Sequence, residues 1–204
     1  YLPGATLALG KIYGPYLVTL QAGDCFAIVE MKDGRVVVSD NQVRLHDVEM
    51  NGRIEQIQRE VAKELFDCAL EDVSEDKRGG VRGKMWDRFC LELCDARRED
   101  VNNKQSRRGY GLLNGQSRLR EMLQAQTFSL KEIATAIFVT DGLIPWSVMK
   151  SSNDQEIGVA IVKAYHEGGL TGLLIAARGE EKKMEATHYT NQAEATGVVL
   201  DFTK

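Results

Sequence analysis

The sequence predicts an α+β fold in which the sheet is mainly antiparallel. Short strand-like runs with short connections fill the first 40 residues, and segments with helical periodicity follow in groups rather than in alternation with strands. The chain has 204 residues, which is enough for one domain with a substantial core. Neither an internal repeat nor a long linker divides it, so we expect residues 1–204 to form a single domain.

The N-terminal part reads as a meander of strands. Three runs rich in β-branched and aromatic residues predict strands at residues 6–12, 16–22 and 26–31. The pair Gly14-Pro15 separates the first two runs. Asp33-Gly34 suits a tight hairpin turn, after which residues 35–39 return as the next strand.

Helical periodicity begins at about residue 53. Apolar residues recur every three or four positions between 53 and 73, which predicts an amphipathic helix. Residues 75–83 contain three glycines and mixed charge, so we expect a loop there. A second helix is predicted at 84–97, followed by a polar loop at 99–109. Residues 53–109 therefore form a helical insert.

The C-terminal part mixes helices with two strands. The helices are predicted at 116–126, from Asn153 or Asp154 to 167 with a stop at Gly168, and again from Thr171. A hydrophobic run at 133–140 predicts a strand, 180–183 a charged turn, and 197–202 the closing strand.

Composition excludes some classes of protein. The net charge is −4, and the densest basic patch, within 97–108, is interrupted by acidic residues, so no nucleic-acid partner is expected. No apolar run approaches the roughly 18 residues that a membrane span needs. The four cysteines lack the spacing of a zinc site, which favours free thiols and a cytoplasmic location. Because the chain starts at Tyr1 without a Met, in what reads as the lead-in to a strand, we expect the natural protein to begin upstream.

Two aspartates occupy positions suited to metal chemistry. Asp24 follows one predicted strand in Ala22-Gly23-Asp24, and Asp141 follows another in Thr140-Asp141-Gly142. Carboxylates mounted at strand ends, if they converge, make the oxygen-rich site that Mg²⁺ or Mn²⁺ prefers. Glycine and aspartate pairs are also common in ordinary turns, so the residues alone leave both interpretations open.

Several segments, taken together, resemble the protein phosphatase 2C family. They are Gly4–Leu9, Tyr16–Ala27 with Gly-Asp at the end of its strand, the hairpin Lys32–Arg35, Tyr110–Gly115, Ala136–Leu143 with Thr-Asp-Gly-Leu, and Ala193–Leu200. They follow the order of the family's motifs and span nearly the whole chain.

The resemblance implies a layered α/β/β/α sandwich of two mainly antiparallel sheets with helices outside. It also implies that two or three Mn²⁺ or Mg²⁺ ions hold a water that attacks phosphoserine or phosphothreonine in a protein substrate. Asp141 matches the family's catalytic aspartate, which binds a core metal. Asp24 matches the aspartate that shares an additional metal with the Asp141 position.

The sequence departs from the family pattern in ways that keep alternatives open. The family's first two aspartate motifs are absent and would lie upstream of Tyr1, so we expect residues 1–204 alone to be inactive. Ala193 stands where the last motif places a metal-binding aspartate, and Glu194 or Asn191 would have to compensate. Cys25-Phe26 replaces the usual Ser-Arg pair.

These departures favour, as an alternative, a pseudophosphatase that serves as a binding or regulatory module. An N-terminal-nucleophile hydrolase is a third possibility, which Tyr1 disfavours because that chemistry needs Thr, Ser or Cys at the N-terminus.

Overall fold

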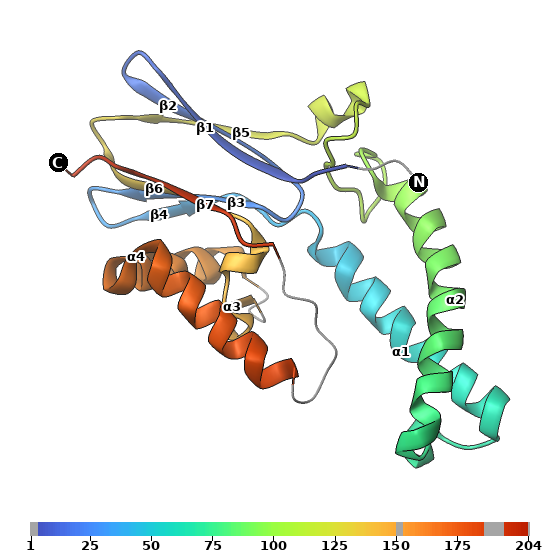
Figure 1. Ribbon diagram of the computed structural model, residues 1–204. Coiled ribbons are helices and arrows are strands. Elements are labelled where there is room, and N and C mark those ends of the chain that lie inside the picture. The colour runs from blue at the N-terminus through green and yellow to red at the C-terminus, as the bar shows by residue number, and fades with distance from the viewer. Residues whose placement is uncertain (1–3, 150–152, 186–193, 204) are drawn as a thin grey trace.

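Two antiparallel sheets form the centre of the protein, as the computed structural model shows for residues 4–149, 153–185 and 194–203 (Figure 1). The first sheet has the order β1 (Leu7–Tyr13), β2 (Tyr16–Ala22), β5 (Gln124–Ser129). The second has the order β4 (Val36–Val38), β3 (Phe26–Met31), β6 (Ile133–Val139), β7 (Gly197–Asp201). The predicted α+β class with antiparallel sheets is confirmed.

The core has two layers, one on each side of the second sheet. Leu17, Val29 and Ile133 belong to the cluster between the two sheets. On the other face, Ile28 and Ile137 pack against Ile157 and Ile161. These last two belong to α4 (Asp154–Glu185), which with α3 (Trp146–Met149) covers this face (Figure 1). Among the described residues the outer helical layer lies on this second sheet.

Helix α4 consists of two helical pieces. Gly169 has φ +63°, outside helical geometry, and breaks the helix one residue after the predicted stop at Gly168. The charged turn predicted at 180–183 is wrong, because helical backbone continues to Glu185.

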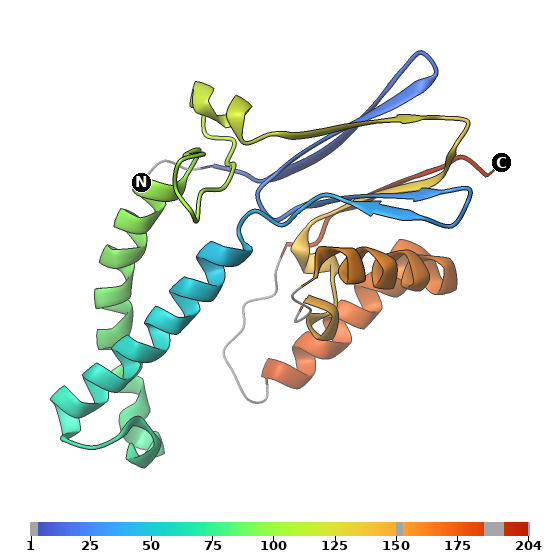
Figure 2. The ribbon, with the colours of Figure 1, turned by 180° about the vertical axis from the view of Figure 1, so that it is seen from behind.

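A long helical pair projects from one end of the sheets (Figures 1 and 2). It comprises α1 (Arg44–Phe66), the 3₁₀ turn η1 (Leu70–Asp72) and α2 (Glu75–Asp100). The pair has its own apolar core, to which Ile57, Val61, Met85 and Phe89 belong. The two helices predicted within 53–109 are therefore present as a projecting pair, but the first spans Arg44–Phe66 and so begins and ends earlier than the apolar periodicity indicated.

The predicted loop at 75–83 is wrong, since these residues form the first turns of α2. Its glycines, Gly79, Gly80 and Gly83, have nothing within 4 Å of where a Cβ would lie. They lower the intrinsic helix propensity, but Val81 and Met85 are buried in the core of the pair. Tertiary packing therefore overrides the local preference.

The helix predicted at 116–126 is also wrong. Residues Ser117–Glu121 form the 3₁₀ turn η2, and the chain then enters β5. Strand β5 pairs with β2 over its whole length, from Gln124 opposite Gln21 to Ser129 opposite Tyr16. The sequence feature that could have predicted this strand is the alternation of small and polar residues in Gln124–Ser129.

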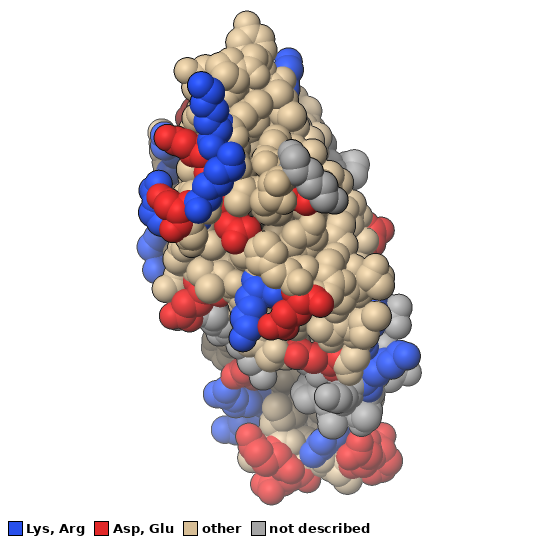
Figure 3. Space-filling view, turned by 90° about the vertical axis from the view of Figure 1, so that its left-hand side faces the viewer, with Lys and Arg blue, Asp and Glu red and all other residues tan. Residues whose placement is uncertain are grey.

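The described part of the chain contains no helix that is both long and apolar enough to cross a membrane. On the face that Figure 3 shows, acidic and basic side chains are interspersed rather than gathered by sign.

Candidate functional site

The two aspartates singled out from the sequence meet at one end of the second sheet. Strands β3 and β6 are antiparallel, with Phe26 opposite Val139. Asp24 lies two residues before that pair on one strand and Asp141 lies two residues after it on the other. The negative charge of Asp24 is close enough to raise the pKa of Asp141. The structure thus brings together two residues that are far apart in sequence.

Local geometry fixes the backbone around both aspartates. Gly23 has φ +83°, and a Cβ there would lie 2.2 Å from Cγ2 of Thr6, so glycine is needed for both conformation and space. The Gly23 amide donates a hydrogen bond to Oε1 of Gln42 at 3.1 Å. On the other strand, the Gly142 amide donates to Oδ1 of Asp141 at 2.8 Å.

Partial desolvation raises the pKa of Asp141 from its ordinary value, and the charge of Asp24 raises it further. The hydrogen bond from Gly142 acts in the opposite direction by stabilising the carboxylate. Two like charges in one neighbourhood make the ionised pair costly. A bound cation would offset this repulsion.

A third carboxylate, Asp47, belongs to the same electrostatic neighbourhood. Its pKa is raised to about 6, first by desolvation and then by the charges of Asp24 and Asp141, whereas Arg97 lowers it. Sequence reasoning missed Asp47 because it placed the start of the helix at residue 53. The residue that indicated the earlier helix start was Asn41. Its Oδ1 accepts hydrogen bonds from the amides of Val43 and Arg44 at 2.9 and 3.2 Å, as a helix-capping side chain does.

Glu194 reaches the site through its main chain. Oγ1 of Thr140 donates a hydrogen bond to the Glu194 carbonyl at 3.1 Å, and the Thr140 amide donates to the Thr196 carbonyl at 3.0 Å. The segment that carries Glu194 therefore runs beside the residue that precedes Asp141. Ala193 and Asn191, the other positions of that predicted motif, lie outside the described residues.

The carboxylates suit a hard divalent cation by their chemistry, since Mg²⁺ and Mn²⁺ prefer oxygen ligands. However, in residues 4–149, 153–185 and 194–203, no three His, Cys, Asp or Glu side chains form a group that could hold a metal ion. The charges of the three aspartates, Asp24, Asp47 and Asp141, thus influence one another, but their side chains do not converge on one point.

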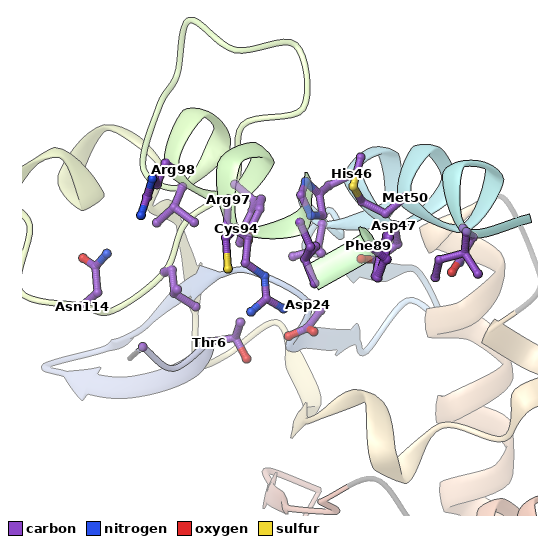
Figure 4. A pocket seen from close by; sticks show the side chains of 18 of the residues that line it. Thr6, Asp24, His46, Asp47, Met50, Phe89, Cys94, Arg97, Arg98 and Asn114 are labelled. Carbon is purple, nitrogen blue, oxygen red and sulfur yellow. The ribbon is translucent and has the colours of Figure 1, made fainter. Parts of the chain in front are cut away.

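A cavity of about 550 Å³ opens beside Asp24, between the helical pair and the start of β1 (Figure 4). Asp24 and Asp47 line it together with Arg97, whose side chain reaches from α2 toward Asp24 and Thr6 in Figure 4. Apolar side chains form another part of the lining: Met50, Ile54, Phe89 and Leu93. The cavity therefore combines negative, positive and apolar surfaces.

A buried polar network holds the two helices over this cavity. Nδ1 of His46 donates a hydrogen bond to Oδ2 of Asp100 at 3.1 Å, and both side chains are almost fully buried. Asp100 also accepts from Ser106 Oγ at 2.6 Å and pairs with Arg108 Nε at 3.1 Å. Because His46 is next to Asp47, and Asp100 follows Arg97 by one turn, the network positions both cavity residues.

Cys25 does not have the properties of a nucleophile. It is buried, and its Sγ lies 3.2 Å from Oγ1 of Thr6. Desolvation and then the charges of Asp24 and Asp141 raise the pKa of its thiol, although the Thr6 hydrogen bond lowers it. A neutral buried thiol is unreactive, so Cys25 joins β1 to the start of β3 as a structural residue.

Comparison with known proteins leaves the family open, because no family model matches the chain and no curated protein matches it.

Proposed function

We propose that this protein hydrolyses phosphoserine or phosphothreonine in protein substrates with the help of Mn²⁺ or Mg²⁺. The observation that carries the proposal is the meeting of Asp24 and Asp141 at the end of the β3–β6 pair, beside a cavity that also holds an arginine. The ordered motifs that resemble protein phosphatase 2C support the same function. The sandwich of two antiparallel sheets is consistent with it.

The residues of this chain would have distinct tasks in that reaction. Asp24 and Asp141, with Asp47 or the Glu194 segment nearby, would hold cations by their carboxylate oxygens. When bound, the divalent ions supply an acidified water as the nucleophile toward phosphorus. Gly23 and Gly142 hold the backbone that presents the two aspartates, as their hydrogen bonds show. We also propose a cytoplasmic location, which the four free cysteines support.

The test is hydrolysis of p-nitrophenyl phosphate by the intact protein, including any residues that precede Tyr1. We expect turnover that requires Mn²⁺ or Mg²⁺, stops with EDTA, and falls at least about 100-fold in Asp141→Asn. Asp33→Asn is the matched control, because Asp33 is an exposed hairpin carboxylate paired with Arg35 at 2.7 Å. A folded intact protein without metal-dependent turnover would contradict the proposal.

A pseudophosphatase is the second candidate function, and a specific observation favours it. The described residues contain no complete group of metal ligands, and the sequence has Ala193 at a predicted ligand position. If the protein is a binding module with an otherwise intact site, Ala193→Asp should create metal-dependent turnover that the wild type lacks. Rapid turnover by the wild type excludes this alternative.

A further inference from the structure

We propose that the cavity beneath the helical pair binds the substrate, with Arg97 holding the phosphoryl oxygens and the apolar wall contacting an apolar residue next to the phosphorylated one. This inference rests on the proposed phosphatase function and names the substrate class for the same site: phosphopeptides with apolar neighbours of the phosphorylated residue. The helical insert would then be the part of the chain that selects substrates.

The cavity lining is periodic along both helices of the pair. The residues that α1 contributes are spaced by three and four positions: His46, Asp47, Met50, Asn51 and Ile54. Those from α2 are also on one face: Phe89, Leu93, Cys94, Arg97 and Arg98. Side chains with this spacing share one side of a helix. Both helices therefore turn a continuous face toward the cavity, and the apolar part of that face also packs in the core of the helical pair.

Arg97 lies in the cavity lining beside two carboxylates, Asp24 and Asp47. Its Nε atom is buried, its charge reaches Asp47, and its side chain extends toward Asp24 (Figure 4). A guanidinium presents several N–H donors in one plane, which suits two oxygens of a phosphoryl group. Arg98 differs, because it is 76% exposed, pairs with Asp95 at 3.4 Å and points away from Asp24 in Figure 4. Arg97 is thus the cation placed beside the carboxylates.

The apolar wall of the cavity is held by the core of the helical pair. Phe89 is 97% buried, and Met50, Ile54 and Leu93 pack against the same core cluster of the helical pair. Side chains held in a core give a wall of defined shape, on which an apolar group loses contact with water. The volume of about 550 Å³ lies within the roughly 300–1,000 Å³ range of small-ligand pockets. It can hold a phosphorylated side chain together with one neighbour.

Binding of inorganic phosphate to the intact protein with Mn²⁺, followed by calorimetry, tests Arg97 without requiring turnover. We expect Arg97→Ala to weaken phosphate binding roughly 10- to 100-fold and Arg97→Lys to weaken it less, because lysine keeps the charge but not the planar donors. Arg59→Ala is the matched control, since Arg59 is 63% exposed on α1 and pairs with Glu55 one turn away. Thermal unfolding of each variant shows that it is folded. Equal phosphate affinity in the wild type and a folded Arg97→Ala would overturn the role of Arg97.

Kinetics with two phosphothreonine peptides test the apolar wall. The peptides carry leucine or asparagine on both sides of the phosphothreonine, and we expect a KM at least about 10-fold lower for the leucine peptide. Leu93→Asn should remove most of this preference, whereas Leu91→Asn, at a residue of α2 that is 72% exposed and does not line the cavity, should keep it. Equal KM values for the two peptides in an active wild type would refute the substrate class but leave the phosphatase function intact. An inactive wild type would instead contradict the proposed function.

Discussion

His46 and Asp100 are joined by a 3.1 Å hydrogen bond in which both side chains are shielded from water. The bond connects the first turn of α1 to the last turn of α2, so it determines how the two helices converge at the cavity. Asp100 is also the partner of Ser106 and of Arg108. One carboxylate therefore joins the helical pair to the loop that follows it.

Asp100→Asn should destabilise the protein by roughly 2–4 kcal/mol. The substitution removes the charge that Arg108 and His46 face in a buried setting, and an uncompensated polar group there is costly. Urea unfolding measures the change. Asp95→Asn is the control, because Asp95 is 74% exposed and its effect should stay within about 0.5 kcal/mol. An equally small effect for Asp100→Asn would show that the network does not hold the helices.

Asp47→Asn should stabilise the metal-free protein at neutral pH. The pKa of Asp47 is raised from 3.8 to about 6, so the folded state holds the proton more tightly than the unfolded state. Stability associated with this group is present below pH 4 and is lost as the pH rises through about 6. Asparagine does not ionise, so the Asp47→Asn variant does not lose this stability as the pH rises.

We expect Tm of Asp47→Asn to exceed the wild-type value by about 2–4 °C at pH 7.5, which corresponds to about 1 kcal/mol after allowance for solvent screening. The difference should vanish at pH 4 and below. Scanning calorimetry in EDTA at both values measures it. A lower Tm for the variant at pH 7.5 would mean that Arg97 outweighs Asp24 and Asp141 around this carboxylate.

Gly23→Ala and Gly34→Ala form a matched pair that separates strain from steric conflict. Both glycines have positive φ, +83° and +85°, so alanine is strained at either position. A Cβ at Gly34 has nothing within 4 Å, whereas at Gly23 it would lie 2.2 Å from Cγ2 of Thr6. We expect a cost of about 1 kcal/mol for Gly34→Ala and roughly 2–4 kcal/mol for Gly23→Ala in urea unfolding. Equal costs would show that Thr6 moves aside.

Mn²⁺ should raise Tm of the intact wild-type protein in a concentration-dependent way. A ligand that binds only the folded state stabilises it by an amount that grows with ligand concentration, about 2.7 kcal/mol at 100 times Kd. Asp141→Asn should lose most of this increase, while Asp33→Asn should keep it. This readout needs no substrate, so it separates metal binding from catalysis. A similar Mn²⁺ response in Asp141→Asn and the wild type would place the metal elsewhere.

All the described strands except β5 were predictable, because their signals are local. Asp33-Gly34 and the β-branched runs around it determine the hairpin from neighbouring residues alone. Asp24 and Asp141 could be found in the same way, since each follows an apolar strand. Their proximity depends on the β3–β6 register, which links distant parts of the sequence.

The start of α1 was not predictable from apolar periodicity, because distant polar partners stabilise it. Arg44 forms an ion pair with Asp154, and Glu49 pairs with Arg107 and with Arg108. Such contacts leave no pattern within a short window of sequence. Asp47 was missed for this reason, although Asn41 marked the helix start.

The β3–β6 pairing also has a consequence for the order of folding. The helical pair between these strands has its own apolar core, made by contacts close in sequence. Docking β6 against β3 instead requires closure of a long loop, which is entropically costly and slow. Asp24 and Asp141 approach each other only at that docking step, so their repulsion acts on the late stage of assembly. We therefore expect the helical pair to form early and the two carboxylates to come together later, when β6 docks against β3.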